Sequence, residues 1–175
     1  MADDSLLVIS ESHGLPPRIG SLAAMLRYGR HTTLSEVRGL SQAELDHLQD
    51  PESNSIAALL HHIASVEWVY QLITFEGRDP TAAERAEWGP ALDLGEAGRT
   101  HLRGRPLDFY VDLLERVRAH TLEGLRHRDD AWLAVRHQRQ SGPVDHHWMW
   151  FHVLEDELNH RGQIRWLKRR LPQQA

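Results

Sequence analysis

The sequence contains no cysteine among its 175 residues. A disulfide framework, a thiolate zinc site and a catalytic cysteine are therefore all excluded. If the protein performs chemistry at sulfur, the thiol has to come from a separate molecule.

Long apolar runs are also lacking. No stretch approaches the length expected of a transmembrane helix, and the N-terminus Met1-Ala2-Asp3-Asp4 lacks the basic start of a signal peptide. The net charge of −5 leaves no electrostatic footprint for nucleic acid. We therefore expect a cytoplasmic protein that binds a small-molecule substrate and neither a membrane nor a nucleic acid.

Prolines divide the chain and leave four long proline-free segments, each of which we predict to be a helix. The segments cover roughly residues 18–40, 55–75, 107–127 and 146–170. A chain of 175 residues is long enough for one core, which buries about 70% of the extended surface. The sequence thus predicts an all-α fold, a four-helix bundle with a long connection between helices 2 and 3, as a single domain over residues 1–175.

The connections between these helices differ in length. The second helix follows Asn54, which we expect to act as its N-cap, and residues 77–105 separate it from the third helix. Thr81 and Glu84 predict a short capped helix within this long connection. The later connection, residues 129–144, contains an apolar Trp-Leu-Ala-Val segment, so we expect it to lie across the bundle.

Polar residues occupy one face of the last helix, where an ordinary core helix carries leucines. The stripe consists of His152, Asp156, His160 and Gln163. Residues three or four apart share a helix face, and apolar neighbours on both sides indicate that this face packs against protein. Asp156 and His160 are one turn apart, roughly 5–6 Å between Cβ atoms, a separation that two ligands of one divalent cation can close.

His62 occupies a core position in the apolar pattern of the second helix. One interpretation is a core histidine satisfied by a backbone carbonyl or by water. Because bundles build metal sites on facing helices, we instead predict that His62, Asp156 and His160 bind one divalent ion, zinc or nickel. Three protein ligands leave one position open, as in catalytic zinc sites. We expect the remaining histidines, including His146 and His147, to be solvated.

Other residues of the last helix receive supporting roles. His152 lies about 12 Å along the axis from His160, too far to share one ion, so we expect it to pair with Asp156 and orient the carboxylate. Gly162 predicts a close approach of two helices. Glu157 is an alternative donor to the metal.

Two segments of the chain resemble the DinB/YfiT-like superfamily of metal-binding four-helix bundles. They are residues 59–67, Leu-Leu-His-His-Ile-Ala-Ser-Val-Glu, and residues 152–163, which end in His-Arg-Gly-Gln. The resemblance implies that one histidine of the second helix joins two residues one turn apart on the last helix, which here are His62, Asp156 and His160. The chain departs from the pattern at Asp156, where many relatives carry His and the mycothiol-dependent maleylpyruvate isomerases carry Glu.

The same resemblance implies transfer or isomerisation with a low-molecular-weight thiol such as mycothiol or bacillithiol. We therefore expect a metal-dependent thiol S-transferase with the thiol as co-substrate. One alternative is a metal-dependent hydrolase with Glu155 or Glu157 as general base, although both residues fit solvated helix charges. The other alternative is a non-enzymatic, stress-associated bundle whose metal site is structural or vestigial.

The face of the last helix opposite the polar stripe is also apolar. Its residues are Phe151, Leu154, Leu158 and Gly162. A helix with one face on its own bundle normally turns charges to the other side, so this pattern favours a homodimer across the last helix. Alternatively, residues 132–135 of the preceding connection cover this face.

Overall fold

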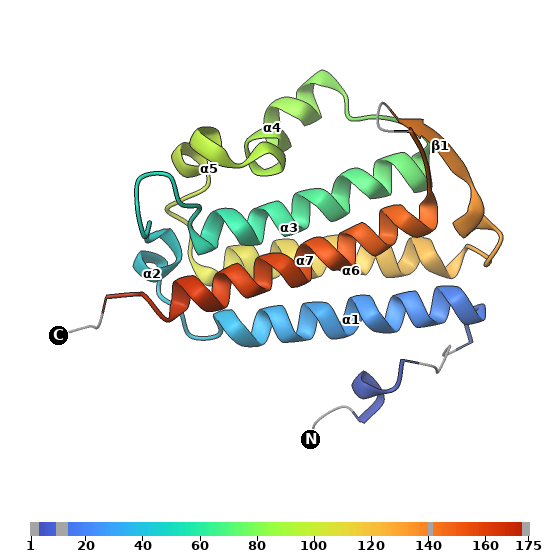
Figure 1. Ribbon diagram of the computed structural model, residues 1–175, viewed down its shortest axis with the longest axis horizontal. Helices are drawn as coiled ribbons and strands as arrows, with labels where there is room; N and C mark the ends of the chain where they lie inside the picture. Colours follow the sequence, from blue (N-terminus) through green and yellow to red (C-terminus); the bar gives the residue numbers. More distant parts are fainter. Residues whose placement is uncertain (1–3, 10–13, 140–141, 173–175) are drawn as a thin grey trace.

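Four long helices lie side by side in the computed structural model, which describes residues 4–9, 14–139 and 142–172 (Figure 1). They are α1 (Pro17–Val37), α3 (Ile56–Gln71), α6 (Leu107–Arg126) and α7 (His146–Lys168). The shorter elements are η1 (Asp4–Leu7), α2 (Gln42–Asp46), the π-helical turn η2 (Leu72–Glu76), α4 (Ala82–Asp93), α5 (Gly95–His101), η3 (Trp132–Ala134), β1 (Arg136–Arg139) and β2 (Gly142–Asp145). The expectation of a mostly helical protein is confirmed, whereas the hairpin was not predicted.

Side-chain caps determine where the two ligand-bearing helices begin. Asp145 accepts a hydrogen bond from the backbone N–H of Trp148 at 2.8 Å and starts α7 where the sequence predicted. The helix α3 starts one residue later than predicted, because Ser55 and not Asn54 is its N-cap. The Ser55 hydroxyl accepts from the N–H of Ala58 at 3.1 Å.

The long connection between α3 and α6 folds into α4, which packs on α3, and α5, which packs on α4 (Figure 1). The predicted capping box is present at the start of α4. The Thr81 hydroxyl accepts from the N–H of Glu84 at 3.3 Å, and the Glu84 carboxylate accepts from the N–H of Thr81 at 2.8 Å. This connection therefore forms part of the wall around α3.

The apolar core lies between the four long helices. One part of it joins α3, α6 and α7 through Leu59, Leu60, Ile63, Leu114, Ile164 and Leu167. A second part joins α1, α6 and α7 through Ile19, Leu22, Leu26, Leu125, Trp150 and Val153. At Gly124 of α6, a Cβ atom would lie 2.5 Å from the ring of Phe75, so only glycine allows this contact.

A network of four buried charged residues lies among these apolar side chains, one from each long helix. Its members are Arg30, Glu67, Arg118 and Glu157. Arg118 donates to Glu67 at 2.6 and 3.0 Å and to Glu157 at 2.9 Å. Arg30 donates to Glu157 at 2.8 Å and to Glu67 at 2.9 Å. Burial alone would raise the pKa of Glu67, but the two guanidinium groups outweigh it and lower this pKa.

The network corrects two expectations for Glu157. Its side chain is 0% exposed, and both carboxylate oxygens accept from arginine. Glu157 is therefore neither an alternative metal donor nor a solvated general base. Its carboxylate instead joins α7 to α1 and α6 through hydrogen bonds from Arg30 and Arg118.

The second apolar face of α7 packs on α1 of the same chain. Leu154 and Leu158 lie 3.0 and 3.8 Å from the position that a Cβ atom would take at Gly29. The close helix approach that we predicted at Gly162 therefore occurs at Gly29, because no other described part of the chain lies within 4 Å of the Cβ position at Gly162. Packing within one chain thus explains Leu154 and Leu158, whereas Phe151 and Gly162 are exposed. The preceding connection also contacts α7, because Trp132 and Leu133 belong to the same apolar cluster as Leu154.

The segment from α3 through η2, Ile56–Glu76, is long and apolar enough to cross a membrane by length and composition alone, with a mean hydropathy of 1.2. The expectation that no stretch reaches this length is therefore wrong. However, 72% of its most apolar window is buried inside the protein, which is the pattern of a core helix.

The hairpin and η3 connect α6 to α7 at one end of the long helices (Figure 1). His146, the first residue of α7, is 3% exposed, and its Nε2 lies 2.7 Å from Nε2 of His137. Burial lowers the pKa of His146 to about 4. The expectation of a solvated His146 is therefore wrong, whereas His147 is exposed and pairs with Arg18 at 3.0 Å.

Candidate metal centre

Three potential metal ligands from two helices meet between α3 and α7. They are His62 of α3 and Asp156 and His160 of α7, and one atom from each lies within 4.8 Å of the others. Within the described part of the chain, this is the one group of three or more histidine, cysteine or acidic residues with such spacing. The structure therefore brings together all three residues that the sequence predicts as ligands.

The distances fit atoms arranged around an ion better than they fit hydrogen bonds. Asp156 Oδ1 lies 3.5 Å from Nε2 of His62 and 3.3 Å from Nε2 of His160. A charge-assisted hydrogen bond spans about 2.7–2.9 Å, whereas two atoms that are each about 2.0–2.1 Å from a tetrahedral ion lie about 3.3 Å apart. The cluster thus has the dimensions of a three-ligand site for a small divalent cation.

The backbone of α4 orients His62. Its Nδ1 donates to the carbonyl oxygen of Ala91 at 2.7 Å. This carbonyl belongs to the last turn of α4, where carbonyl oxygens have no partner within the helix. Because a carbonyl only accepts, Nδ1 carries a proton, and in the neutral imidazole the Nε2 lone pair faces Asp156. A backbone carbonyl therefore satisfies one nitrogen of His62, as the core-histidine interpretation expects, and the other nitrogen is available as a metal ligand.

Gln163 has the corresponding role for His160. Its Oε1 accepts from Nδ1 of His160 at 3.1 Å, so in the neutral imidazole the Nε2 lone pair of this ring also faces Asp156. Gln163 stood in the predicted polar stripe but had no predicted function. Its position three residues after His160 on the same helix face is the signal that could have identified it.

Asp156 is the least satisfied member of the cluster. Burial alone would raise its pKa, but the approach of His160 and His62 outweighs burial and holds this pKa well below its usual range. Its Oδ2 is buried and has no hydrogen-bond partner among the described residues. For His160, burial opposes the charged form, yet the Asp156 carboxylate prevails and raises the pKa. A divalent cation would satisfy this concentration of negative charge and lone pairs.

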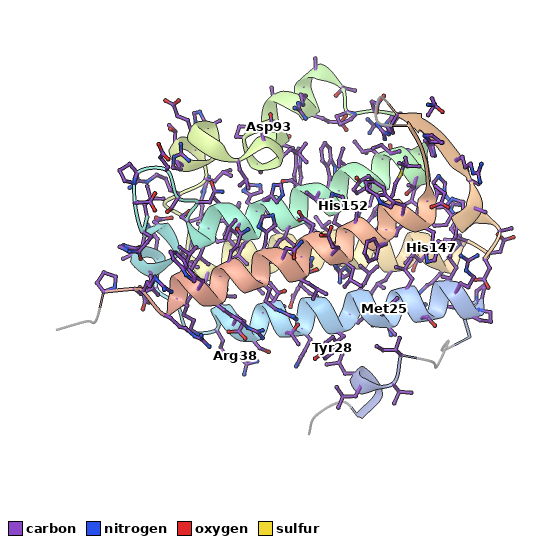
Figure 2. The ribbon with its side chains drawn as sticks, viewed as in Figure 1. Met25, Tyr28, Arg38, Asp93, His147 and His152 are labelled. Atoms are coloured by element: carbon purple, nitrogen blue, oxygen red, sulfur yellow. The ribbon has the colours of Figure 1, made fainter. Side chains whose placement is uncertain are left out.

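His152 does not orient Asp156, so its predicted role is wrong. Its Nδ1 lies 3.1 Å from Glu155, and its ring stacks on Trp148 and meets the edge of Tyr70. Figure 2 labels His152 on α7, and no described hydrogen bond joins it to Asp156. Residues four apart on a helix are rotated by about 40°, so the stripe curves and carries His152 away from the cluster.

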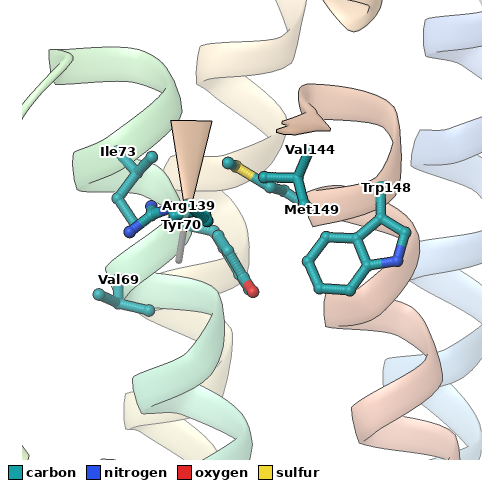
Figure 3. Close-up of a pocket in the computed structure, with 7 residues that line it drawn as sticks. All are labelled: Val69, Tyr70, Ile73, Arg139, Val144, Trp148 and Met149. Atoms are coloured by element: carbon teal, nitrogen blue, oxygen red, sulfur yellow. The ribbon is translucent and has the colours of Figure 1, made fainter. Parts of the chain in front are cut away.

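Two cavities lie along the boundary of α3 and α7, one on either side of the cluster along the helix axes, and none of the three ligands is among their described lining residues. The first, of about 760 Å³, is lined by Tyr70 and Met149 among others and lies toward the hairpin (Figure 3). The second, of about 430 Å³, is lined by Asn159 and Gln163 and so reaches the residue that orients His160. Volumes of about 300–1,000 Å³ are typical of small-molecule sites. Each of the two cavities is therefore large enough for a small molecule.

A mostly helical protein that brings two histidines and one carboxylate together between two long helices falls into the class of candidate helical metal-binding proteins. The family model for mycothiol-S-transferase matches residues 21–172. The chain therefore belongs to the mycothiol-S-transferase family, and the resemblance to the DinB/YfiT-like superfamily is confirmed. No curated protein sequence matches the chain significantly.

The fold is also similar to a crystal structure described as the conserved protein of a locus from Enterococcus faecalis. The TM-score is 0.67, and the similarity covers 85% of this chain and 93% of that chain at 17% sequence identity. At this identity the similarity shows the fold alone.

Proposed function

We propose that the protein is a divalent-metal-dependent thiol S-transferase, built as a four-helix bundle of the DinB-like type, that holds zinc or nickel with His62, Asp156 and His160. The observation that supports this proposal most strongly is the approach of two imidazole Nε2 atoms to Oδ1 of Asp156, whose other oxygen, Oδ2, is buried without a hydrogen-bond partner among the described residues. Membership of the mycothiol-S-transferase family supports a thiol as co-substrate. The absence of cysteine agrees with an external nucleophile.

The residues of the cluster would have separate tasks in this reaction. A bound divalent ion lowers the pKa of a coordinating thiol. His62 and His160 present Nε2 lone pairs whose direction Ala91 and Gln163 set, and Asp156 contributes the negative charge that retains the cation. The thiolate then attacks an electrophilic carbon. A carbon–sulfur bond forms, the leaving group departs with its electron pair, and the thiol proton passes to solvent.

A metal-dependent hydrolase is the second candidate, because an open metal position can also activate water. Such a reaction needs a general base beside the cluster. Of the two residues considered for this role, Glu157 is engaged by two arginines, and Glu155 bonds to His152 and Asn159. These partners favour thiol transfer over hydrolysis.

The proposal is tested with metal-depleted protein that is reconstituted with zinc or nickel and offered mycothiol, bacillithiol or glutathione together with a panel of electrophiles. We expect chelator-sensitive conjugates from the wild type and none from His160→Ala, with His31→Ala as a matched histidine control on the exposed face of α1. Equal metal content in wild type and His160→Ala would show that the cluster is not the metal site. Full metal content without conjugation of any thiol would favour the structural, stress-associated alternative.

We further propose a cytoplasmic protein without a nucleic-acid or membrane partner, and we keep the homodimer as a proposal on a different surface. Since α1 covers Leu154 and Leu158, the surface left for a partner copy is the one around Phe151, which is 54% exposed. Light scattering of the wild type and Phe151→Asp tests this. A monomeric wild type at micromolar concentration contradicts the homodimer.

A further inference from the structure

The larger cavity beside the cluster has an apolar body and a basic rim. Val69, Ile73 and Met149 form part of its apolar wall, and the indole of Trp148 stands opposite the side chains of Tyr70 and Arg139 (Figure 3). Arg139 comes from β1, so the hairpin supplies the charge while α3, η2 and α7 supply the apolar surface. No acidic side chain is among the described residues that line this cavity.

The guanidinium group of Arg139 is available to a ligand. Its described ion pair is with Asp79 at 3.8 Å, and the two side chains are 37% and 81% exposed. Exposed pairs of this length contribute little. A ligand carboxylate inside the cavity would meet the same guanidinium in a less hydrated setting and at hydrogen-bond distance, where the interaction is stronger.

The cavity is close enough to the cluster for one molecule to reach both. Val69 follows His62 by seven residues on α3, and Met149 precedes Asp156 by seven on α7, which places the cavity about 10 Å along the helix axes from the ligands. Tyr70 connects the two regions. Burial raises the pKa of Tyr70, Arg139 acts to lower it, and Asp156 acts to raise it further.

We propose that this cavity binds an apolar, preferably aromatic, organic acid, with its carboxylate on Arg139 and its ring against Trp148 and Met149, and that such acids are the electrophilic acceptors of the transfer. The assignment as acceptor rests on the proposed function, whereas the binding of the acid does not. The second cavity, beside Gln163 on the other side of His160, remains for the body of the thiol. The two reactants would then meet at the cluster from opposite directions.

The test compares 2-naphthoate with 2-naphthamide, two ligands of similar shape that differ in charge, by titration calorimetry on chelator-treated protein without thiol. The wild type should bind naphthoate at least about 10-fold more tightly than naphthamide, because a hydrogen bond to a charged group is stronger than a neutral one. In Arg139→Gln this preference should disappear while naphthamide binding stays unchanged. Trp148→Ala should weaken both ligands, which assigns the ring to this cavity.

The matched control is Arg136→Gln, an exposed arginine on the same strand that does not line the cavity. It should bind both ligands as the wild type does. Equal affinity of the wild type for the two ligands, or equal effects of Arg136→Gln and Arg139→Gln, would overturn the proposal. If naphthoate binds through Arg139 but substituted aromatic acids with a leaving group form no thiol conjugate, the acceptor assignment is wrong and the acid site stands.

Discussion

Asp156 and Glu157 are neighbours on α7, yet their carboxylates have opposite environments. Both oxygens of Glu157 accept from arginine, and the side chain is 0% exposed. Asp156 shares one oxygen with two imidazoles at 3.3 and 3.5 Å, and its other oxygen has no hydrogen-bond partner among the described residues. On α7, Glu157 thus belongs to a fully paired closed network with Arg30, Glu67 and Arg118, whereas Asp156 belongs to an open cluster with His62 and His160.

The difference shows how the same type of side chain serves packing or ligand binding. In the closed network, the charges of two carboxylates and two guanidinium groups balance, so no unpaired charge is left to bind an added ion. In the open cluster, one carboxylate faces two imidazoles and no arginine or lysine, so a negative charge and lone pairs are left for an added ion when the imidazoles are neutral. The closed network should therefore determine stability, and the open cluster should determine metal binding.

The largest effect is expected for Glu157→Ala. This change leaves two buried guanidinium groups with a single carboxylate, and removing one partner of a buried ion pair destabilises a protein by about 3–5 kcal/mol. Urea unfolding of the metal-free protein measures the loss. Glu155→Ala, two residues away and more exposed, is the control and should change stability by less than about 0.5 kcal/mol. Similar losses for both variants would mean that the network adds no stability.

The open cluster should behave in the opposite way. Zinc at about 100 times its Kd should stabilise the wild type by about 2.7 kcal/mol, because it binds the folded state alone. His160→Ala should lose this gain, whereas His31→Ala should keep it. Thermal unfolding with and without zinc measures the difference. A zinc-dependent stabilisation that survives in His160→Ala would contradict the predicted ligand set.

A smaller effect, on metal affinity, should distinguish Gln163 from His152. Gln163→Ala should weaken metal binding by about 10-fold, since Gln163 fixes the ring of His160 and loss of such an outer partner typically has this size. His152→Ala should leave metal affinity unchanged because His152 bonds to Glu155. Competition with a chromogenic chelator gives both affinities. A weaker site in His152→Ala alone would restore the role that the sequence predicted for it.

The helices and the ligand triad could be predicted because their signals are local. Prolines and capping residues set the helix boundaries to within a few residues, and the four-residue spacing of Asp156 and His160 identifies one shared face. The hairpin gave no such signal. Its strands, Arg-His-Gln-Arg and Gly-Pro-Val-Asp, show no alternation of apolar and polar residues.

The closed network could not be predicted in the same way, because its four members lie on four different helices and no sequence spacing relates them. Each of them alone fits a solvated helix charge. One clue was present at Glu67, the one acidic residue of the mostly apolar helix α3, since a buried carboxylate requires a partner. The partners themselves depend on how the four helices pack.

The smallest effect concerns pH and again distinguishes the two networks. The pKa of His160 is raised in the metal-free fold, so its pairing with Asp156 contributes stability below the unfolded value of about 6.5 and loses it as pH rises through the folded pKa. Asp156 stays ionised throughout, because its pKa lies below its usual range. His61 and His146, whose pKa values burial lowers to about 4, change stability only below about pH 6.5.

Metal-free protein should therefore have a lower urea midpoint at pH 8.5 than at pH 6.5, and Asp156→Asn should remove this difference. With excess zinc the direction should reverse, because the metal requires a neutral His160 and so binds more tightly as pH rises. Glu157 bonds to Arg30 and Arg118 and not to His160, so Glu157→Gln should keep the pH trend of the wild type at a lower overall stability. A trend that persists in Asp156→Asn would assign it to another histidine and separate the open cluster from the pH response.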